Sequence, residues 1–190
     1  MKYLALIFSF LWIISSCNSQ EITDKEEQIK QAVMAVAEKD RADCTVYGFT
    51  DDGTFVKLRE GTNRMICIAD DPTKKGFSVA CYHKELDPFM ARGRQLKSEG
   101  KTSSEIFDIR EEEVKSKKLP LPDNSTLSVL SGKFDEQTGE PIALKLRYVF
   151  YIPFATSEST GLPTAPVVEG GPWIMDPGTH KDHIMINPKQ

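Results

Sequence analysis

Residues 65–83 read MICIADDPTKKGFSVACYH, two apolar runs on either side of a turn-rich segment. Met65–Ala69 is apolar at every position, which is typical of a strand buried on both faces. We interpret Phe77–His83 as the next strand and residues 70–76 as the loop that joins the two. This pair predicts the centre of a β-sheet.

Residues before this pair predict a hairpin and a helix. Cys44–Phe49 and Thr54–Arg59 follow a period of two and flank Asp51-Asp52-Gly53, a strong hairpin signal. With the central pair they make about four antiparallel strands, which we expect in meander order. The capping box Thr23–Glu26 precedes apolar residues at helical spacing and predicts an amphipathic helix over about 24–40.

Residues after the central pair predict two more helices and further strands. Asp87-Pro88 begins the first helix, which ends at Gly100, and Thr102–Glu105 offers a capping box for the second. Strand spacing returns at four places, which are Leu127–Leu130, Leu144–Ile152, Trp173–Met175 and His183–Asn187. The fold class is therefore α+β, an antiparallel sheet with additional C-terminal strands packed against about three helices.

Composition limits the class of protein. The chain has 190 residues, of which 39% are hydrophobic and 27% charged. These values exclude a polytopic membrane protein, a collagen-like repeat and a fully disordered chain. Its 24 basic and 28 acidic residues give a net charge of −4, which argues against nucleic acid as the main partner.

The N-terminus resembles a bacterial export signal. Lys2 precedes a 12-residue apolar run, Tyr3–Ile14, too short for a membrane-spanning helix of about 20 residues. Ile14-Ser15-Ser16-Cys17 resembles the lipobox, which implies cleavage and lipidation at Cys17; the alternative is a plain secretory peptide. We therefore divide the chain into a signal peptide (1–16), a lipidated tether (17–22) and one globular α+β domain (23–190).

These segments predict a compartment. Several acyl chains hold a soluble domain at a membrane without a spanning helix. We expect the bacterial cell envelope, with the membrane contacted through the N-terminal lipid. Asn18 is non-acidic, which favours the outer membrane if the source is Gram-negative.

Short strings across most of the chain resemble a known family. The strings are LREGTN at 58–63 followed by Cys67, DDP at 70–72 and CYH at 81–83; PFMARGR at 88–94; YIPFATSESTGLP at 151–163; and GPWIM at 171–175 followed by HIM at 183–185. They resemble a family of uncharacterised exported bacterial proteins. The resemblance implies one compact domain and the pairing of Cys67 with Cys81, but no activity.

Three cysteines remain if Cys17 carries lipid: Cys44, Cys67 and Cys81. An exported protein meets an oxidising compartment, so one disulfide and one free thiol is the simplest interpretation. If the two central strands pair antiparallel about their loop, Cys67 and Cys81 lie opposite each other. The rival interpretation is a nucleophilic Cys81 thiolate with His83 two residues away.

The histidines suggest a possible metal site. His180 and His183 follow Asp176 within eight residues, and His83 is a further candidate ligand. The alternative is a solvated His180 and a hydrogen-bonded His183 at the start of a strand. No cofactor is required by the sequence.

Other residues suggest a binding site. Arg59 and Asn63 flank Gly61-Thr62, and the guanidinium group of Arg59 suits either an anionic ligand or a buried acid. With His83 and His183 they are our candidate ligand-binding residues. Residues 153–172 form a long loop without periodicity, so we expect it to wall the main cleft, with His183 and Arg59 facing it; the alternative is a cover for a sheet edge.

Two functions follow. The first is a membrane-anchored lipoprotein of the cell envelope, a non-enzymatic domain that binds a small molecule or an envelope protein. The second is a metal-dependent or histidine-dependent envelope hydrolase that uses His83, Asp176, His180 and His183. No recognisable catalytic arrangement favours the second, so we expect no enzymatic activity.

The lipid anchor makes the first testable prediction. Cys17→Ser removes the acylated thiol, so we expect the variant to leave the membrane fraction without unfolding, because the tether lies outside the core. Fractionation after a high-salt wash measures this. Retention of the variant in the membrane contradicts the anchor.

Overall fold

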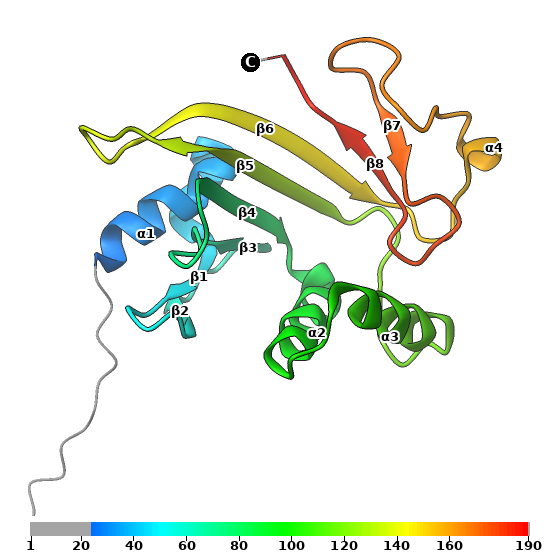
Figure 1. Cartoon of the computed structure of the whole chain (residues 1–190), viewed down its shortest axis with the longest axis horizontal. Coiled ribbons are helices and arrows are strands. Elements are labelled where there is room, and N and C mark those ends of the chain that lie inside the picture. Colours follow the sequence, from blue (N-terminus) through cyan, green and yellow to red (C-terminus); the bar gives the residue numbers. More distant parts are fainter. Residues whose placement is uncertain (1–23, 190) are drawn as a thin grey trace, which may run out of the picture.

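Among the described residues, eight strands form one mixed sheet in the order β2-β1-β3-β4-β5-β6-β8-β7 (Figure 1). The computed structural model describes residues 24–189, so the predicted signal peptide, the lipid site Cys17 and the tether lie outside the described residues. The strands are β1 (Thr45–Phe49), β2 (Phe55–Arg59), β3 (Met65–Ile68), β4 (Phe77–His83), β5 (Thr126–Phe134), β6 (Pro141–Tyr151), β7 (Trp173–Met175) and β8 (His183–Ile186).

The predicted α+β class is confirmed, because the described residues combine this sheet with helices. They are α1 (Lys25–Ala32), α2 (Asp87–Ser98), α3 (Ser103–Lys115) and the short α4 (Ser157–Thr160), with 3-10 turns η1 (Val33–Ala35), η2 (Glu38–Asp43) and η3 (Lys84–Leu86). The sheet is larger than a four-stranded meander with a few added strands. Within residues 24–189, none of the helices has the length and hydrophobicity needed to cross a membrane.

The predicted meander order is wrong at its start. β1 lies between β2 and β3, pairing antiparallel with β2 and parallel with β3. A meander would place β2 beside β3. Instead, the chain leaves the end of β2, crosses beside the first residues of β1 and begins β3 on the other side.

This crossing requires a glycine. Gly61 lies so close to the entry of β1 that a Cβ there would be 2.2 Å from the backbone nitrogen of Thr45 and the carbonyl carbon of Cys44. Backbone N–H groups of Thr62 and Asn63 both donate to the carbonyl oxygen of Asp43, at 2.9 and 3.0 Å. The crossing is therefore fixed by main-chain contacts that leave no room for a side chain.

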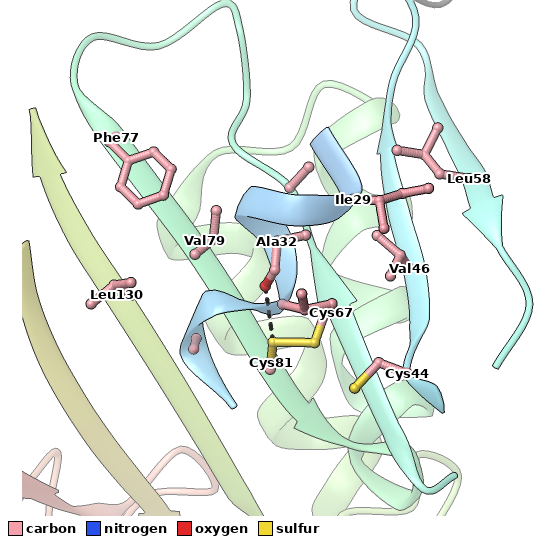
Figure 2. Close-up of a cluster of buried hydrophobic side chains, with 13 residues drawn as sticks. Ile29, Ala32, Cys44, Val46, Leu58, Cys67, Phe77, Val79, Cys81 and Leu130 are labelled. Carbon is pink, nitrogen blue, oxygen red and sulfur yellow. Dashed lines mark hydrogen bonds between the residues drawn. A yellow bond between two sulfur atoms is a disulfide. The ribbon is translucent and has the colours of Figure 1, made fainter. Parts of the chain in front are cut away.

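Two hydrophobic clusters lie on opposite faces of the sheet. One packs α1 and η1 against β1–β5 and includes Cys67, Val79, Cys81 and Leu130, several of which Figure 2 shows. The other packs α2 and α3 against β3–β6 and β8. Neighbouring residues of one strand belong to different clusters, as Cys81 and Tyr82 do, because successive side chains point to opposite faces.

The predicted disulfide is present inside the first cluster. Cys67 and Cys81 are register partners on β3 and β4, and their sulfur atoms are bonded (Figure 2). The disulfide therefore excludes the nucleophilic Cys81. Cys44 is a buried free cysteine whose thiol donates to the carbonyl oxygen of Asp40, and burial raises its pKa.

The first helix is shorter than predicted. α1 ends at Ala32, η1 tightens the next turn, and Val36 is extended rather than helical. Val33 and Val36 are β-branched and favour a helix only weakly, while Val33 and Ala35 are buried in the first cluster. Packing against the sheet therefore ends the helix early. The predicted capping box of the third helix is confirmed, with Thr102 as the N-cap and Glu105 as its partner.

The crossing makes a stability prediction. Gly61→Ala places a methyl group on main-chain atoms that hold β1, so we expect a loss of at least about 2 kcal/mol in the free energy of unfolding. Urea denaturation measures the change.

Gly93→Ala is the matched control. The atoms nearest to a Cβ at this helical glycine belong to the side chain of Arg110, the closest at 3.0 Å. We expect alanine there to leave stability unchanged or raise it by up to about 1 kcal/mol, because alanine is the better helix former. Equal effects of the two substitutions would contradict the account of the crossing.

Candidate functional site

A groove of about 690 Å³ lies on the sheet beside the loop that joins β6 to β7. Its floor comes from alternate residues of adjacent strands: Ser131 of β5 is the register partner of both Ser78 on β4 and Lys145 on β6, and Val129 is the partner of Arg147. Trp173 and Asn187 complete the floor. These residues come from five separate segments, so only the folded sheet assembles them.

The wall of the groove is formed by residues 166–170. Part of the loop 153–172 therefore forms a wall of this groove, as predicted, but without His183 and Arg59. The loop is more regular than its sequence suggested, because it contains α4, capped by Thr156 at its start and by Gly161, in a left-handed conformation, at its end. Val167 and Val168 are 79% and 66% exposed at the rim.

The polar groups of the groove are not the predicted ones. Lys145 and Arg147 line it, whereas Arg59 and His183 do not. Neither Lys145 nor Arg147 forms an ion pair with any residue of 24–189. The Nε of Arg147 donates to the side-chain oxygen of Asn187 at 3.1 Å, which orients the guanidinium group. Glu169, the one carboxylate in the lining, pairs with Lys189 at 3.3 Å.

The position of the groove follows from how the helices cover the sheet. Leu144 and Leu146 of β6 pack against the cluster under α1, whereas Val149 and Tyr151 belong to the opposite cluster under α2 and α3. β6 thus changes its buried face along its length. Lys145 and Arg147 share the face of Val149 but lie before the region that α2 and α3 cover. A groove remains there.

Arg59 and Asn63 have structural contacts. Arg59 donates from Nε to the carbonyl oxygen of Cys44 at 3.1 Å and from a terminal nitrogen to that of Arg41 at 2.5 Å. The amide nitrogen of Asn63 donates to the carbonyl oxygen of Asp40 at 2.9 Å. Both side chains therefore hold the end of η2 at the crossing, and the expected buried acid or anionic ligand is replaced by main-chain carbonyl groups.

The proposed metal ligands are dispersed. His83 is at the end of β4, where its ring nitrogen accepts from the backbone of Glu85. Asp176 pairs with Lys181 at 3.0 Å, and the Nδ1 of His183 donates to the carbonyl oxygen of Lys181 at 2.7 Å. Across the described part of the chain, no group of three or more His, Cys, Asp or Glu side chains is suited to hold a metal ion.

His180 is fully buried, contrary to the expectation that it is solvated. Its ring contacts the rings of Phe89 and Phe107, at centroid distances of 5.6 and 4.7 Å. Nδ1 lies 3.1 Å from a carboxylate oxygen of Glu111, and since a carboxylate only accepts, Nδ1 carries the proton. Burial lowers the pKa of His180, which favours the neutral ring. This contact fastens the β7–β8 loop to α3.

Asp182 is the second buried ionisable group of this loop. Its side chain is fully buried and accepts a hydrogen bond from the backbone N–H of Gly178 at 3.3 Å. Burial raises the pKa of Asp182 to about 6. The negative charge of Asp182 is therefore unfavourable in the folded protein above that pH.

Sequence reasoning missed Lys145, Arg147, Trp173 and Asn187. Two cations alternating with Leu144 and Leu146 were the available signal, because such a pattern places both charges on one face of a strand. The alternation does not show which face of the sheet the helices leave uncovered at this position.

Comparisons of the chain with models of protein families, with curated proteins and with solved structures found no match. The resemblance to uncharacterised exported bacterial proteins stays a prediction from the sequence.

Asp182 makes a pH prediction. Its folded pKa of about 6 exceeds the ordinary value of 3.8, so its contribution to stability is complete below pH 3.8 and is lost as pH rises through 6. Asp182→Asn removes that loss. We expect the variant to gain stability over the parent protein between pH 4.5 and pH 8, by up to about 2 kcal/mol.

Urea denaturation at the two pH values measures this difference, and contributions from His180 and His183 cancel because both proteins carry them. Asp123→Asn, at an exposed position, serves as the control. A difference between Asp182→Asn and the parent that does not change with pH contradicts the assignment.

Proposed function

We propose that the protein is an exported domain, held at the cell envelope by a lipid on Cys17, which binds a small molecule in the groove between β5–β6 and the 166–170 wall. The observation that carries the proposal is the lining, in which two cations without ion-pair partners among residues 24–189 and a half-buried tryptophan share one groove. Its volume of about 690 Å³ falls in the range of 300–1,000 Å³ typical of small-molecule sites.

The lining favours binding over catalysis. Catalytic acids, bases and nucleophiles are most often His, Cys, Asp or Glu side chains, or a serine beside a base. The lining contains Ser78 and Ser131 but no histidine or cysteine, and its single carboxylate is already paired. His180 and Asp182 are both fully buried, so neither favours a hydrolase.

The arrangement of the elements suits a tethered binding domain. α1, which follows the proposed tether, and the β6–β7 loop lie toward opposite ends of the long axis of the molecule (Figure 1). The loop that carries the wall is therefore separated from the helix that follows the proposed lipid site (Figure 1). Lipidation itself is inferred from residues 14–17 and is tested by Cys17→Ser.

Binding in the groove is tested by NMR on an isotope-labelled full chain that carries Cys17→Ser. We use three planar probes, namely indole, naphthalene-2-carboxamide and naphthalene-2-carboxylate. At least one is expected to shift the amide signals of Val129, Arg147, Trp173 and the wall, because all four surround the same groove.

Two variants locate the site. Replacing residues 166–169 by glycine removes the wall and is expected to abolish the shifts in a protein that remains folded. Tyr148→Ala alters an exposed aromatic residue on the opposite face of β6 and should leave them unchanged. Shifts that cluster elsewhere, or that survive the loss of the wall, contradict the proposed site.

A further inference from the structure

We infer that the ligand of the groove is an anion with a planar apolar body, its oxyanion held by Arg147 and Lys145 and its planar part by Trp173. This inference rests on the proposed function of the groove and adds the chemical class of the ligand. A carboxylate and a phosphate share the required oxyanion chemistry.

Two neighbouring cations give the floor of the groove a local positive charge. Lys145 and Arg147 lie two residues apart on one face of β6, which places their Cα atoms about 7 Å apart. Like charges at this spacing repel each other, and neither has an acidic partner within residues 24–189. The whole chain is nevertheless acidic, with a net charge of −4. A bound anion would neutralise this local positive charge.

The orientation of Arg147 carries the second step. Asn187 accepts from Nε at 3.1 Å and so occupies one of the five guanidinium donors. The terminal nitrogens have no side-chain partner among the described residues. A guanidinium group held in this way can bind a planar oxyanion through two parallel hydrogen bonds. The loss of side-chain conformational entropy on binding is small, because Asn187 already restricts the guanidinium group.

The negative charge of Glu169 in the wall is paired with Lys189. Glu169 would repel an anion from the groove if it were unpaired, but its carboxylate lies 3.3 Å from the ammonium group of Lys189. The carboxylate of Glu169 is thus neutralised at the rim, and the positive charge of Lys145 and Arg147 dominates the floor.

The apolar surface carries the last step. Trp173 is half-buried and lines the groove together with Val129, and Val167 and Val168 of the wall are 79% and 66% exposed. Two adjacent aliphatic side chains exposed at the rim of a groove indicate surface that a ligand covers. A planar group lying on the indole ring would fill this part of the groove.

The test compares matched probes on the full chain carrying Cys17→Ser and Trp12→Phe, so that Trp173 supplies the only tryptophan side-chain signal. Naphthalene-2-carboxylate, 2-naphthyl phosphate and the neutral naphthalene-2-carboxamide are titrated separately. We expect at least one anion to bind about tenfold or more tightly than the amide, because hydrogen bonds to charged groups are the stronger ones. Which anion binds more tightly identifies the preferred oxyanion.

Variants separate charge from shape. Arg147→Gln and Lys145→Gln should each reduce the preference for the anion, and Asn187→Ala should weaken the anion more than the amide. Lys133→Gln removes an exposed lysine of β5 that lies outside the groove and should change nothing. The spectrum of each variant shows whether it is folded, and the exposed Lys145 provides a test if Arg147→Gln does not fold.

The outcomes distinguish the two proposals. Equal binding of the anions and the amide in the groove overturns this inference and leaves the proposed function standing. Failure of these three probes to shift groove residues overturns the inference, and failure of indole as well overturns the proposed function too. An anion preference that survives Arg147→Gln and Lys145→Gln together also overturns the inference, because its charge would then be recognised elsewhere.

Discussion

The rest of the structure depends on one close contact, the passage of Gly61 against the main chain at the entry of β1. A Cβ there would lie 2.2 Å from backbone atoms of Cys44 and Thr45. This passage delivers β3 to the far side of β1 and makes the two strands parallel. Every later strand lies on the side of β3 that faces away from β1, so the contact fixes where the remaining sheet forms.

The helices cover different regions of the two faces of the sheet, and the groove lies where this cover is missing. α1 packs on one face toward β1–β5, and α2 and α3 pack on the other toward the end of β6. One corner of the second face keeps no helix, and the β6–β7 loop borders it. This partial cover explains why Lys145 and Arg147 are exposed, whereas Val149 on the same face of β6 is buried.

Several residues that the sequence suggested as site residues make structural contacts in the folded protein. Arg59 and Asn63 donate hydrogen bonds to main-chain carbonyl groups at the crossing. The ring of His180 contacts Phe89 and Phe107, and its Nδ1 is hydrogen-bonded to the carboxylate of Glu111. From the sequence alone, Arg59, which holds a turn through main-chain carbonyl groups, cannot be told apart from Arg147, which lines the groove. The difference lies in which carbonyl groups or solvent surround the guanidinium group.

The sequence by itself determined the local features: the α+β class, the hairpin at residues 51–53, the capped third helix, the pairing of Cys67 with Cys81 and the presence of a long aperiodic loop at 153–172. Each depends on residues close together in the chain, where turn chemistry, capping and periodicity act directly. Only the tertiary structure decided the parallel pairing of β1 with β3, the early end of α1 and the residues of the groove. These depend on contacts between distant segments, and a period of two places Lys145 and Arg147 on one face without telling which face the helices leave uncovered.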